Sequence, residues 1–511
     1  MKQKRLKAMG VFFLIGAVFL IAALSDICFV DGTAYKASAV MQRKEDIVIK
    51  RQRGGFADRN MIPLVDETVQ NFCIDENGVL NTDKGSEVSP IPVRYAKDSV
   101  GAHLIGYLDI DGNGVSGLEK VFDSYLKCDD TINVSAVKSA NGKLIQTAGI
   151  STQKDENSAD FIKLTIDTHI QKAAEDVLNN HSVTGSAVIL DVDTFDVLAM
   201  ASYPTFDRNN VQKYVKSNGS ELVNRSLCEY NAGSIFKIIT LCSALERGKT
   251  LDSYTCTGSI SAGEHTFNCH KADGHGYLNT KEAFAKSCNC AFYTLGQALG
   301  SEAILDAARF FDLGNPAVSY DGFDEARGNI PSKSSYSPLD CINYSIGQGE
   351  ILITPVQAAS VACVIASGGI KKAINIADAV CTCSGEKKIN LRKTEEKRVI
   401  SLYTAQYLKE CMRLAVTDGT GQTLASSSAA IAGKTGTAET GWIKDGKNLE
   451  HGWFCGFFPY DKPKYAMAVI AEGGGSGSMS AAPVFMDIAE EINRIYPVEN
   501  FQTVEREQTA K

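Results

Sequence analysis

The stretch Tyr230–Gly248 reads YNAGSIFKIITLCSALERG. After Gly233, apolar side chains recur three and four residues apart, which is the spacing of one buried helical face. They are Ile235, Ile238, Ile239, Cys242 and Leu245. Gly248 follows at a position typical of a helix C-cap. The pattern therefore predicts a buried helix whose first turn carries Ser234.

Ser234 and Lys237 share one face of this predicted helix, with Cβ atoms about 5–6 Å apart. A serine beside a lysine is suited to nucleophilic catalysis when burial lowers the lysine pKa and leaves its amine partly neutral. Free backbone N–H groups at the helix start also favour a developing oxyanion. The same Ser-x-x-Lys spacing occurs in three polar segments, where we expect exposed loops: Ser135/Lys138, Ser151/Lys154 and Ser384/Lys387.

Ser287 and Asn289 form a polar island in the apolar helical pattern KEAFAKSCNCAFYTLGQAL, residues 281–299. Polar groups in such surroundings are expected to be hydrogen-bonded, and a cleft is one place where this happens. A cap at a helix boundary is the alternative interpretation.

Lys434, Thr435, Gly436 and Thr437 lie in AAIAGKTGTAETG, residues 429–441, which has the alternation of a strand. A lysine and two hydroxyls on one strand are suited to binding a carboxylate. The glycine would allow another backbone or a substrate to approach closely. An edge strand followed by a turn is the structural alternative.

Ser-x-x-Lys, Ser-x-Asn and Lys-Thr-Gly, in this order, form the motif set of the penicilloyl-serine transferases. The chain resembles class B penicillin-binding proteins, the monofunctional peptidoglycan transpeptidases, over about residues 50–490. Other stretches are similar to further motifs of that family: RGGFADRNMIPL (53–64), AHLIGYL (102–108), GVSGLEKVFDSYL (114–126), LTIDTHIQ (164–171), VLAMASYPTFDRN (197–209), GQGEILITPVQAA (347–359) and HGWFCGFFP (451–459). Two positions depart from the family pattern, because Ala232 replaces a usual Pro and Met61 a usual Gly.

The resemblance implies a D,D-transpeptidase that cross-links stem pentapeptides and is acylated by β-lactams. Ser234 would attack the penultimate D-Ala carbonyl, and Lys237 would take its proton. Ser287 and Asn289 would help relay that proton to the departing D-Ala and hold the substrate amide. No glutamate can be assigned as a deacylating base, which favours a long-lived acyl-enzyme with β-lactams.

The resemblance also implies how the substrate is held. Lys434 would supply positive charge, and Thr435 and Thr437 would bind the terminal carboxylate, with Gly436 between them. The backbone N–H groups of Ser234 and Thr437 would form the oxyanion hole. No cofactor is expected.

By resemblance, the fold class is a multi-domain α+β protein. Residues 1–30 would form a cytoplasmic stub and transmembrane anchor. Residues 31–160 would form a small β-rich pedestal and a linker or loose hairpin. Residues 161–496 would form the transpeptidase domain, a five-stranded antiparallel sheet with helices on both faces and an α-helical subdomain. Residues 497–511 would be a polar tail.

The N-terminus combines a basic cluster with an uncharged stretch, AMGVFFLIGAVFLIAAL, over Ala8–Leu24. Its length is at the short end of what crosses a bilayer as a helix, and the basic side is expected in the cytoplasm. We therefore expect a single-pass anchor with an extracytoplasmic catalytic domain, and a cleaved signal peptide is the alternative. By resemblance, the partner is a membrane glycosyltransferase of the shape, elongation, division and sporulation type.

The net charge of -8 makes the chain a poor nucleic-acid binder, because phosphate binding needs a basic surface. Its 15 cysteines suggest an outside space that is not strongly oxidising, although Cys256 and Cys269 are candidates to pair. Zinc is not expected, because the spacing of the possible ligands matches no closed module. These ligands are Cys256, Cys269, His270, His275, Cys288 and Cys290. Calcium at Asp109–Lys120 is not expected either, because the twelfth loop position is a lysine.

Three rival functions share parts of this pattern. A D,D-carboxypeptidase or β-lactamase would use the same nucleophile with water as the acceptor, but a soluble β-lactamase would lack the anchor and pedestal. A β-lactam sensor would need an output domain before the hydrophobic segment. A non-catalytic scaffold would not need all three motifs intact.

Overall fold

The computed structural model describes most of the chain. The described residues are 2–35, 38, 44–65, 68–70, 73–74, 80–81, 91–96, 99–137, 151–154, 160–217, 219–318, 320–332, 337, 339–382, 384–444 and 446–497. Apart from Pro497, the predicted polar tail lies outside this set, as do 138–150 and 155–159 of the predicted linker.

The chain divides into two compact units. The smaller unit comprises Met1–Arg53, Glu67–Arg94 and Cys128–Ala159, and the larger comprises Gly54–Asp66, Tyr95–Lys127 and Asp160–Lys511. Two segments of the predicted pedestal, 54–66 and 95–127, thus group with the larger unit. The reason is partly strand pairing, because β2 (Phe56–Ala57) lies parallel to β9 (Phe161–Leu164).

The smaller unit contains the apolar N-terminal helix and short sheets. Helix α1 (Lys2–Ser25) is exposed and is followed by a π-turn at Asp26–Val30. Within the described residues, Gln3–Phe29 is the one helical stretch long and apolar enough to cross a membrane. The strands are β1 (Lys44–Arg53), β7 (Lys127–Val137) and β8 (Ser151–Lys154) in one sheet, β3 (Thr68–Gln70) with β6 (Ile91–Val93), and β4 (Cys73–Ile74) with β5 (Leu80–Asn81).

The core of the larger unit is a five-stranded antiparallel sheet, as predicted. In spatial order its strands are β11 (Val197–Tyr203), β10 (Gly185–Asp191), β24 (Tyr465–Ala471), β23 (Lys447–Phe458) and β22 (Ala432–Lys444). Side chains alternate between its two faces, as the two-residue period of a strand requires. In β10, Val188 and Leu190 join one buried cluster, whereas Ala187 and Ile189 join the other.

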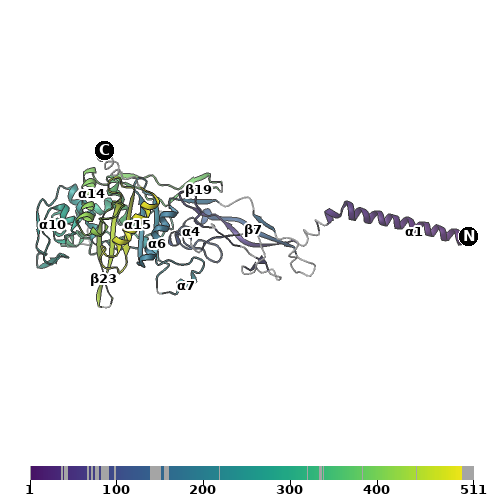
Figure 1. The fold of residues 1–511 in the computed structure, drawn as a ribbon, viewed down its shortest axis with the longest axis horizontal. Helices are drawn as coiled ribbons and strands as arrows, with labels where there is room; N and C mark the ends of the chain where they lie inside the picture. The colour runs from purple at the N-terminus through teal and green to yellow at the C-terminus, as the bar shows by residue number, and fades with distance from the viewer. Residues whose placement is uncertain are drawn as a thin grey trace, which may run out of the picture. The chain divides into compact units, whose positions relative to one another are not determined.

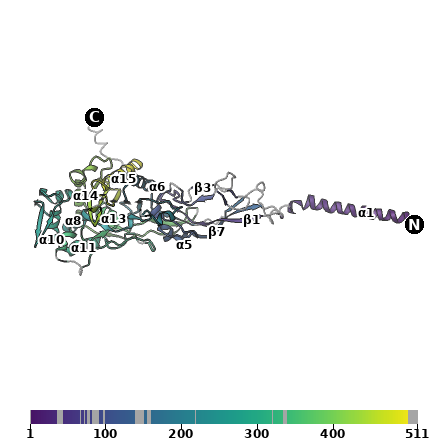
Figure 2. The ribbon, with the colours of Figure 1, turned by 90° about the horizontal axis from the view of Figure 1, so that it is seen from below.

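Helices cover both faces of this sheet. Helix α13 (Pro355–Ala366), in which every residue is buried, packs against β10, β23 and β24. Helices α6 (Thr168–His181) and α15 (Ala481–Ile495) belong to the opposite cluster and lie side by side (Figures 1 and 2). Burial on both faces explains why β24, at the centre of the sheet, is apolar along its whole length.

A helical subdomain precedes β22 in the sequence and contacts this edge strand through α14. Its helices are α8 (Lys237–Glu246), α9 (Thr280–Ala285), α10 (Asn289–Leu299), α11 (Ser301–Phe310), α12 (Asp340–Tyr344) and α14 (Leu402–Thr417). The remaining short helices are α3 (Ala102–Ile105), α4 (Gly117–Val121), α5 (Asp123–Leu126) and α7 (Gln212–Val215).

Small sheets complete the larger unit. Their strands are β12 (Tyr230–Asn231) with β17 (Leu352–Ile353), β13 (Tyr254–Cys256) with β16 (Gly276–Leu278), β14 (Ser259–Ala262) with β15 (His265–Asn268), and β18 (Ile370–Lys372) with β21 (Glu396–Arg398). A four-stranded sheet consists, in spatial order, of β2, β9, β19 (Ala377–Cys381) and β20 (Lys387–Asn390).

Two sequence details have clear structural outcomes. Met61, at the position where the family usually has Gly, adopts φ +69°, a left-handed conformation that suits glycine. The segment that begins like a calcium loop closes as a turn, because Asp109 Oδ1 accepts the N–H groups of Asp111 and Asn113 at 2.9 and 2.8 Å.

Candidate active site

Ser234 lies in a single 3₁₀ turn, Gly233–Phe236, that leads directly into α8. Gly233 adopts φ +55°, and a Cβ there would meet Thr437 O at 2.4 Å. Its N–H donates to Gly347 O at 2.9 Å. The turn is thus held between the Lys-Thr-Gly strand and the segment 347–359, with Ser234 partly exposed.

Lys237 is fully buried and connects the first two motifs. Its Nζ donates to Ser287 O at 2.7 Å, to Ser287 Oγ at 3.2 Å and to Asn289 Oδ1 at 2.7 Å. These three acceptors are uncharged, so nothing in direct contact compensates a buried ammonium. Burial lowers the pKa of Lys237 to about 7. The amine is therefore suited to accept a proton near neutral pH.

The Ser-x-Asn motif marks a break between two helices. Ser287 adopts φ +54°, and Cys288 is the N-cap residue of α10, which begins at Asn289. Both interpretations of this motif therefore apply, because it is a helix boundary and also supplies the acceptors for Lys237. A non-glycine residue in this conformation costs of order 1–3 kcal/mol and is typical of functional sites.

The Lys-Thr-Gly motif lies on the edge strand β22, against the 3₁₀ turn. A Cβ on Gly436 would meet the Trp453 side chain at 2.9 Å and Ile235 Cγ2 at 3.0 Å, so the glycine permits the close approach of the turn. Lys434 is fully buried and donates to Thr435 O at 2.9 Å. Burial, reinforced by repulsion from Lys237, lowers the pKa of Lys434 well below its usual value.

Thr420 is a site residue that the sequence analysis did not identify. Its hydroxyl hydrogen-bonds the hydroxyl of Thr435, and its N–H donates to Ala285 O at 3.1 Å. It therefore connects the Lys-Thr-Gly strand to the end of α9. The only sequence signal is the turn-like DGTG at 418–421, which is common in loops.

The structure thus brings together all the predicted site residues. Lys237 contacts Ser287 and Asn289 directly, and Ser234 lies on the 3₁₀ turn that immediately precedes it. Gly436 and Thr437 pack against that turn, and Lys434 and Thr435 precede them on β22. Trp453 and Phe454, on the neighbouring strand β23, are wholly buried in the sheet.

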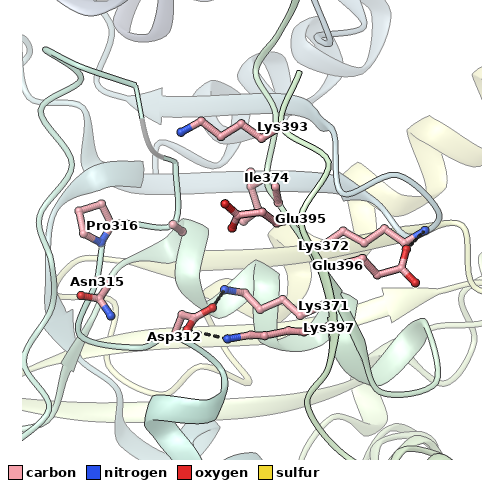
Figure 3. Close-up of a pocket in the computed structure, with 12 residues that line it drawn as sticks. Asp312, Asn315, Pro316, Lys371, Lys372, Ile374, Lys393, Glu395, Glu396 and Lys397 are labelled. Atoms are coloured by element: carbon pink, nitrogen blue, oxygen red, sulfur yellow. Dashed lines mark hydrogen bonds and ion pairs between the residues drawn. The ribbon is translucent and has the colours of Figure 1, made fainter. Parts of the chain in front are cut away.

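A cavity of about 570 Å³ is lined by none of these motif residues. Figure 3 shows five of its charged side chains in ion pairs: Lys397 binds Asp312 at 2.8 Å, Lys371 binds the same carboxylate, and Lys372 lies 3.5 Å from Glu396. Its lining contains no serine, cysteine or histidine. This cavity therefore offers no alternative serine or cysteine nucleophile.

Comparisons with known proteins agree with this geometry. Residues 185–490 match the family model described as penicillin-binding protein transpeptidase domain. The chain is 29% identical over 479 residues to Stage V sporulation protein D of Bacillus subtilis, covering 89% of this chain and 72% of that protein. It is 30% identical over 430 residues to the peptidoglycan D,D-transpeptidase PbpA of Mycolicibacterium smegmatis, covering 78% and 82%.

A solved structure has the same fold. It is penicillin-binding protein 3 of Mycobacterium tuberculosis complexed with ampicillin, with a TM-score of 0.69 and 25% identity, covering 89% of this chain and 97% of that one. The family match spans the sheet and the helical subdomain, and the relatives extend the similarity toward the N-terminus. The chain therefore belongs to the penicillin-binding protein transpeptidase family, as a class B penicillin-binding protein.

Proposed function

We propose that Ser234 is the nucleophile with which this peptidoglycan D,D-transpeptidase forms its acyl-enzyme, and that Lys237 is its base. The observation that carries the proposal is the buried amine of Lys237, whose pKa burial lowers to about 7 and whose Nζ is held by Ser287 and Asn289. A lysine in this state accepts the hydroxyl proton without a charged partner.

In the acylation step, Ser234 Oγ attacks the penultimate D-Ala carbonyl of a stem pentapeptide. The bond from Oγ to the carbonyl carbon forms, and the bond to the nitrogen of the last D-Ala breaks. The proton that leaves the serine passes through Lys237 and the Ser287 hydroxyl to the departing amine. An amine of a neighbouring stem then attacks the ester, which releases Ser234 and leaves a cross-link.

The substrate is held by groups on β22. Lys434 supplies positive charge, and the hydroxyls of Thr435 and Thr437 bind the terminal carboxylate. The backbone N–H groups of Ser234 and Thr437 stabilise the oxyanion. Support for this arrangement comes from the close packing of β22 on the 3₁₀ turn, which leaves no room for a Cβ at Gly436.

We further propose that Gln3–Phe29 anchors the protein in the membrane, with the N-terminus in the cytoplasm. The exposed, apolar helix and the basic residues before it support this orientation. An anchored enzyme would work beside the membrane glycosyltransferase that we propose as its partner. A cysteine-accessibility assay on intact cells tests the orientation, because a membrane-impermeant thiol reagent should not label a cysteine introduced at Gln3.

The catalytic assignment is tested by incubating the full chain, in detergent, with benzylpenicillin and following its intact mass. We expect a stable adduct that maps to Ser234 and is absent from Ser234→Ala. Ser384→Ala is the matched control, because it removes the serine of an exposed Ser-x-x-Lys pair and should leave the adduct unchanged. Rapid return to the free mass with release of hydrolysed drug would favour a hydrolase instead.

A further inference from the structure

Four metal-binding side chains converge beside the Ser-x-Asn motif. They are Cys256, Cys269, His275 and Cys288, and their ligand atoms all lie within 4.8 Å of one another. The Sγ of Cys269 lies 3.5 Å from Nδ1 of His275. A tetrahedral zinc ion, with bonds of about 2.3 Å to sulfur and about 2.0 Å to nitrogen, requires a sulfur-to-nitrogen separation of about 3.5 Å.

The three cysteines of this set are buried as free thiols. Their exposed fractions are 2% for Cys256, 7% for Cys269 and 0% for Cys288. Cys256 and Cys269, the two candidates to pair, are both free thiols. Three thiols packed around an imidazole, without a covalent bond between them, are the ligand types of a structural zinc site.

The two hairpins that carry three of the ligands have almost no apolar core of their own. Between 252 and 277, the buried residues are Cys256, Gly258, Ala262, Cys269 and Gly274. Two cysteines and one alanine are therefore the only buried side chains of this 26-residue segment. A metal ion that joins the two hairpins would stabilise a segment with so little buried apolar surface.

The backbone of these hairpins is shaped to bring the ligands together. A Cβ on Gly258 would meet Ala272 O at 1.9 Å, and a Cβ on Gly274 would meet Cys256 O at 2.2 Å. The N–H of Cys269 donates to Gly258 O at 2.8 Å. Glycine at both crossings allows the loop before β16 to lie directly on the loop after β13.

We propose that Cys256, Cys269, His275 and Cys288 bind one structural Zn²⁺ ion. Four protein ligands complete a tetrahedral shell, which leaves no open position for water and favours a structural role over a catalytic one. On binding, the three thiols release three protons, and the imidazole coordinates in its neutral form. Spacing along the chain did not predict the site, because its ligands come from two hairpins and the start of a helix.

The ion would also position the catalytic Ser-x-Asn motif. Cys288 is the residue between Ser287 and Asn289, the two hydrogen-bond partners of Lys237. A metal bond to its sulfur would hold the backbone in the left-handed conformation at Ser287 and fix the first residue of α10. This part rests on the proposed function, whereas metal binding does not.

Metal content tests the site without reference to activity. The full chain, purified in detergent with a reductant, should contain about one zinc per chain by inductively coupled plasma mass spectrometry. Cys269→Ala should lose it and Cys269→His should keep it. Cys290→Ala is the matched control, because Cys290 is equally buried beside the cluster but is not one of the four ligands.

Wild-type protein provides a second test if Cys269→Ala does not fold. Cobalt added to the chelator-treated chain should give the intense thiolate-to-cobalt charge-transfer bands of a tetrahedral site. Wild-type protein that contains no metal and takes up neither cobalt nor zinc would overturn the proposal. Iron in place of zinc would overturn the choice of metal.

Acylation tests the positioning role. Removing zinc with a strong chelator should slow acylation by a fluorescent penicillin at least about tenfold, as loss of groups that orient a site does. Added zinc should restore the rate, and Cys269→His should acylate like the wild type. Loss of zinc with an unchanged acylation rate would refute positioning. A zinc-loaded chain that forms no adduct at Ser234 would instead refute the proposed function.

Discussion

The rate of acylation of Ser234 should depend on pH through Lys237. Burial lowers the pKa of this lysine to about 7, and only the neutral amine can take the serine proton. With a pKa of about 7, roughly one tenth of the chains carry a neutral Lys237 at pH 6 and roughly nine tenths at pH 8. The second-order acylation rate constant should therefore rise about tenfold between pH 6 and pH 8 and then level off.

Other titratable groups lie near Lys237, and their effect on the pH dependence of acylation has to be distinguished from that of Lys237. Lys434 lies on β22, and the thiols of Cys288, Cys269 and Cys290 oppose the effect of burial. Lys434→Arg is the decisive control, because arginine stays charged throughout this range. If Lys237 is the titrating base, this variant keeps the rise in rate with pH, with a midpoint at the same pH or lower.

A stopped-flow assay with a fluorescent penicillin measures these rate constants, with intact mass as the endpoint. Lys237→Met should form no adduct at any of these pH values. A wild-type rate that stays flat from pH 6 to pH 8 would refute the reasoning. A pH dependence that disappears in Lys434→Arg would assign the titration to the other lysine.

Four further predictions have defined outcomes. Asn289→Asp should place a carboxylate against the buried lysine, raise its pKa and shift the midpoint of the acylation profile to higher pH. Gly233→Ala should lower the free energy of unfolding by about 3 kcal/mol, because strain adds to a backbone clash, whereas Gly248→Ala, which has open space around it, should cost only about 1 kcal/mol by denaturant titration. Met61→Asn should raise the free energy of unfolding by about 0.5–1 kcal/mol, since asparagine tolerates the left-handed conformation; an unchanged denaturation midpoint would contradict this. Thr420→Val should weaken β-lactam recognition about tenfold by removing a hydroxyl bound to the Lys-Thr-Gly strand, and Thr420→Ser should retain the wild-type rate constant.

The parts of the site that could be predicted are those whose residues lie close together along the chain. Ser234 and Lys237 are three residues apart, and the periodicity around them indicates a buried helix, so their shared face follows from local geometry. The alternation around Lys434 likewise predicts the strand. Thr420 could not be found in this way, because its role depends on a hydrogen bond to Thr435 that only the packing of α14 against β22 creates.

The fold was predictable through the family resemblance, and its five-stranded sheet is confirmed. The division of the first 160 residues between the two compact units was harder to predict, because β2 pairs with a strand more than 100 positions later. The proposed metal site was not expected from the sequence for the same reason. Cys256 and Cys288 are 32 positions apart, and no local pattern indicates that the intervening hairpins bring their sulfur atoms together.

The strand order of the central sheet sets a constraint on how the chain is made. β10 is complete at residue 191, but one of its two neighbours is β24, which ends at residue 471. During synthesis, the β10–β11 hairpin must therefore wait for some 270 further residues with a row of unpaired backbone N–H and C=O groups exposed. Such long-range pairing is slow and prone to aggregation. The nascent protein thus carries an unpaired strand edge until β24, the last strand of the described residues, has emerged.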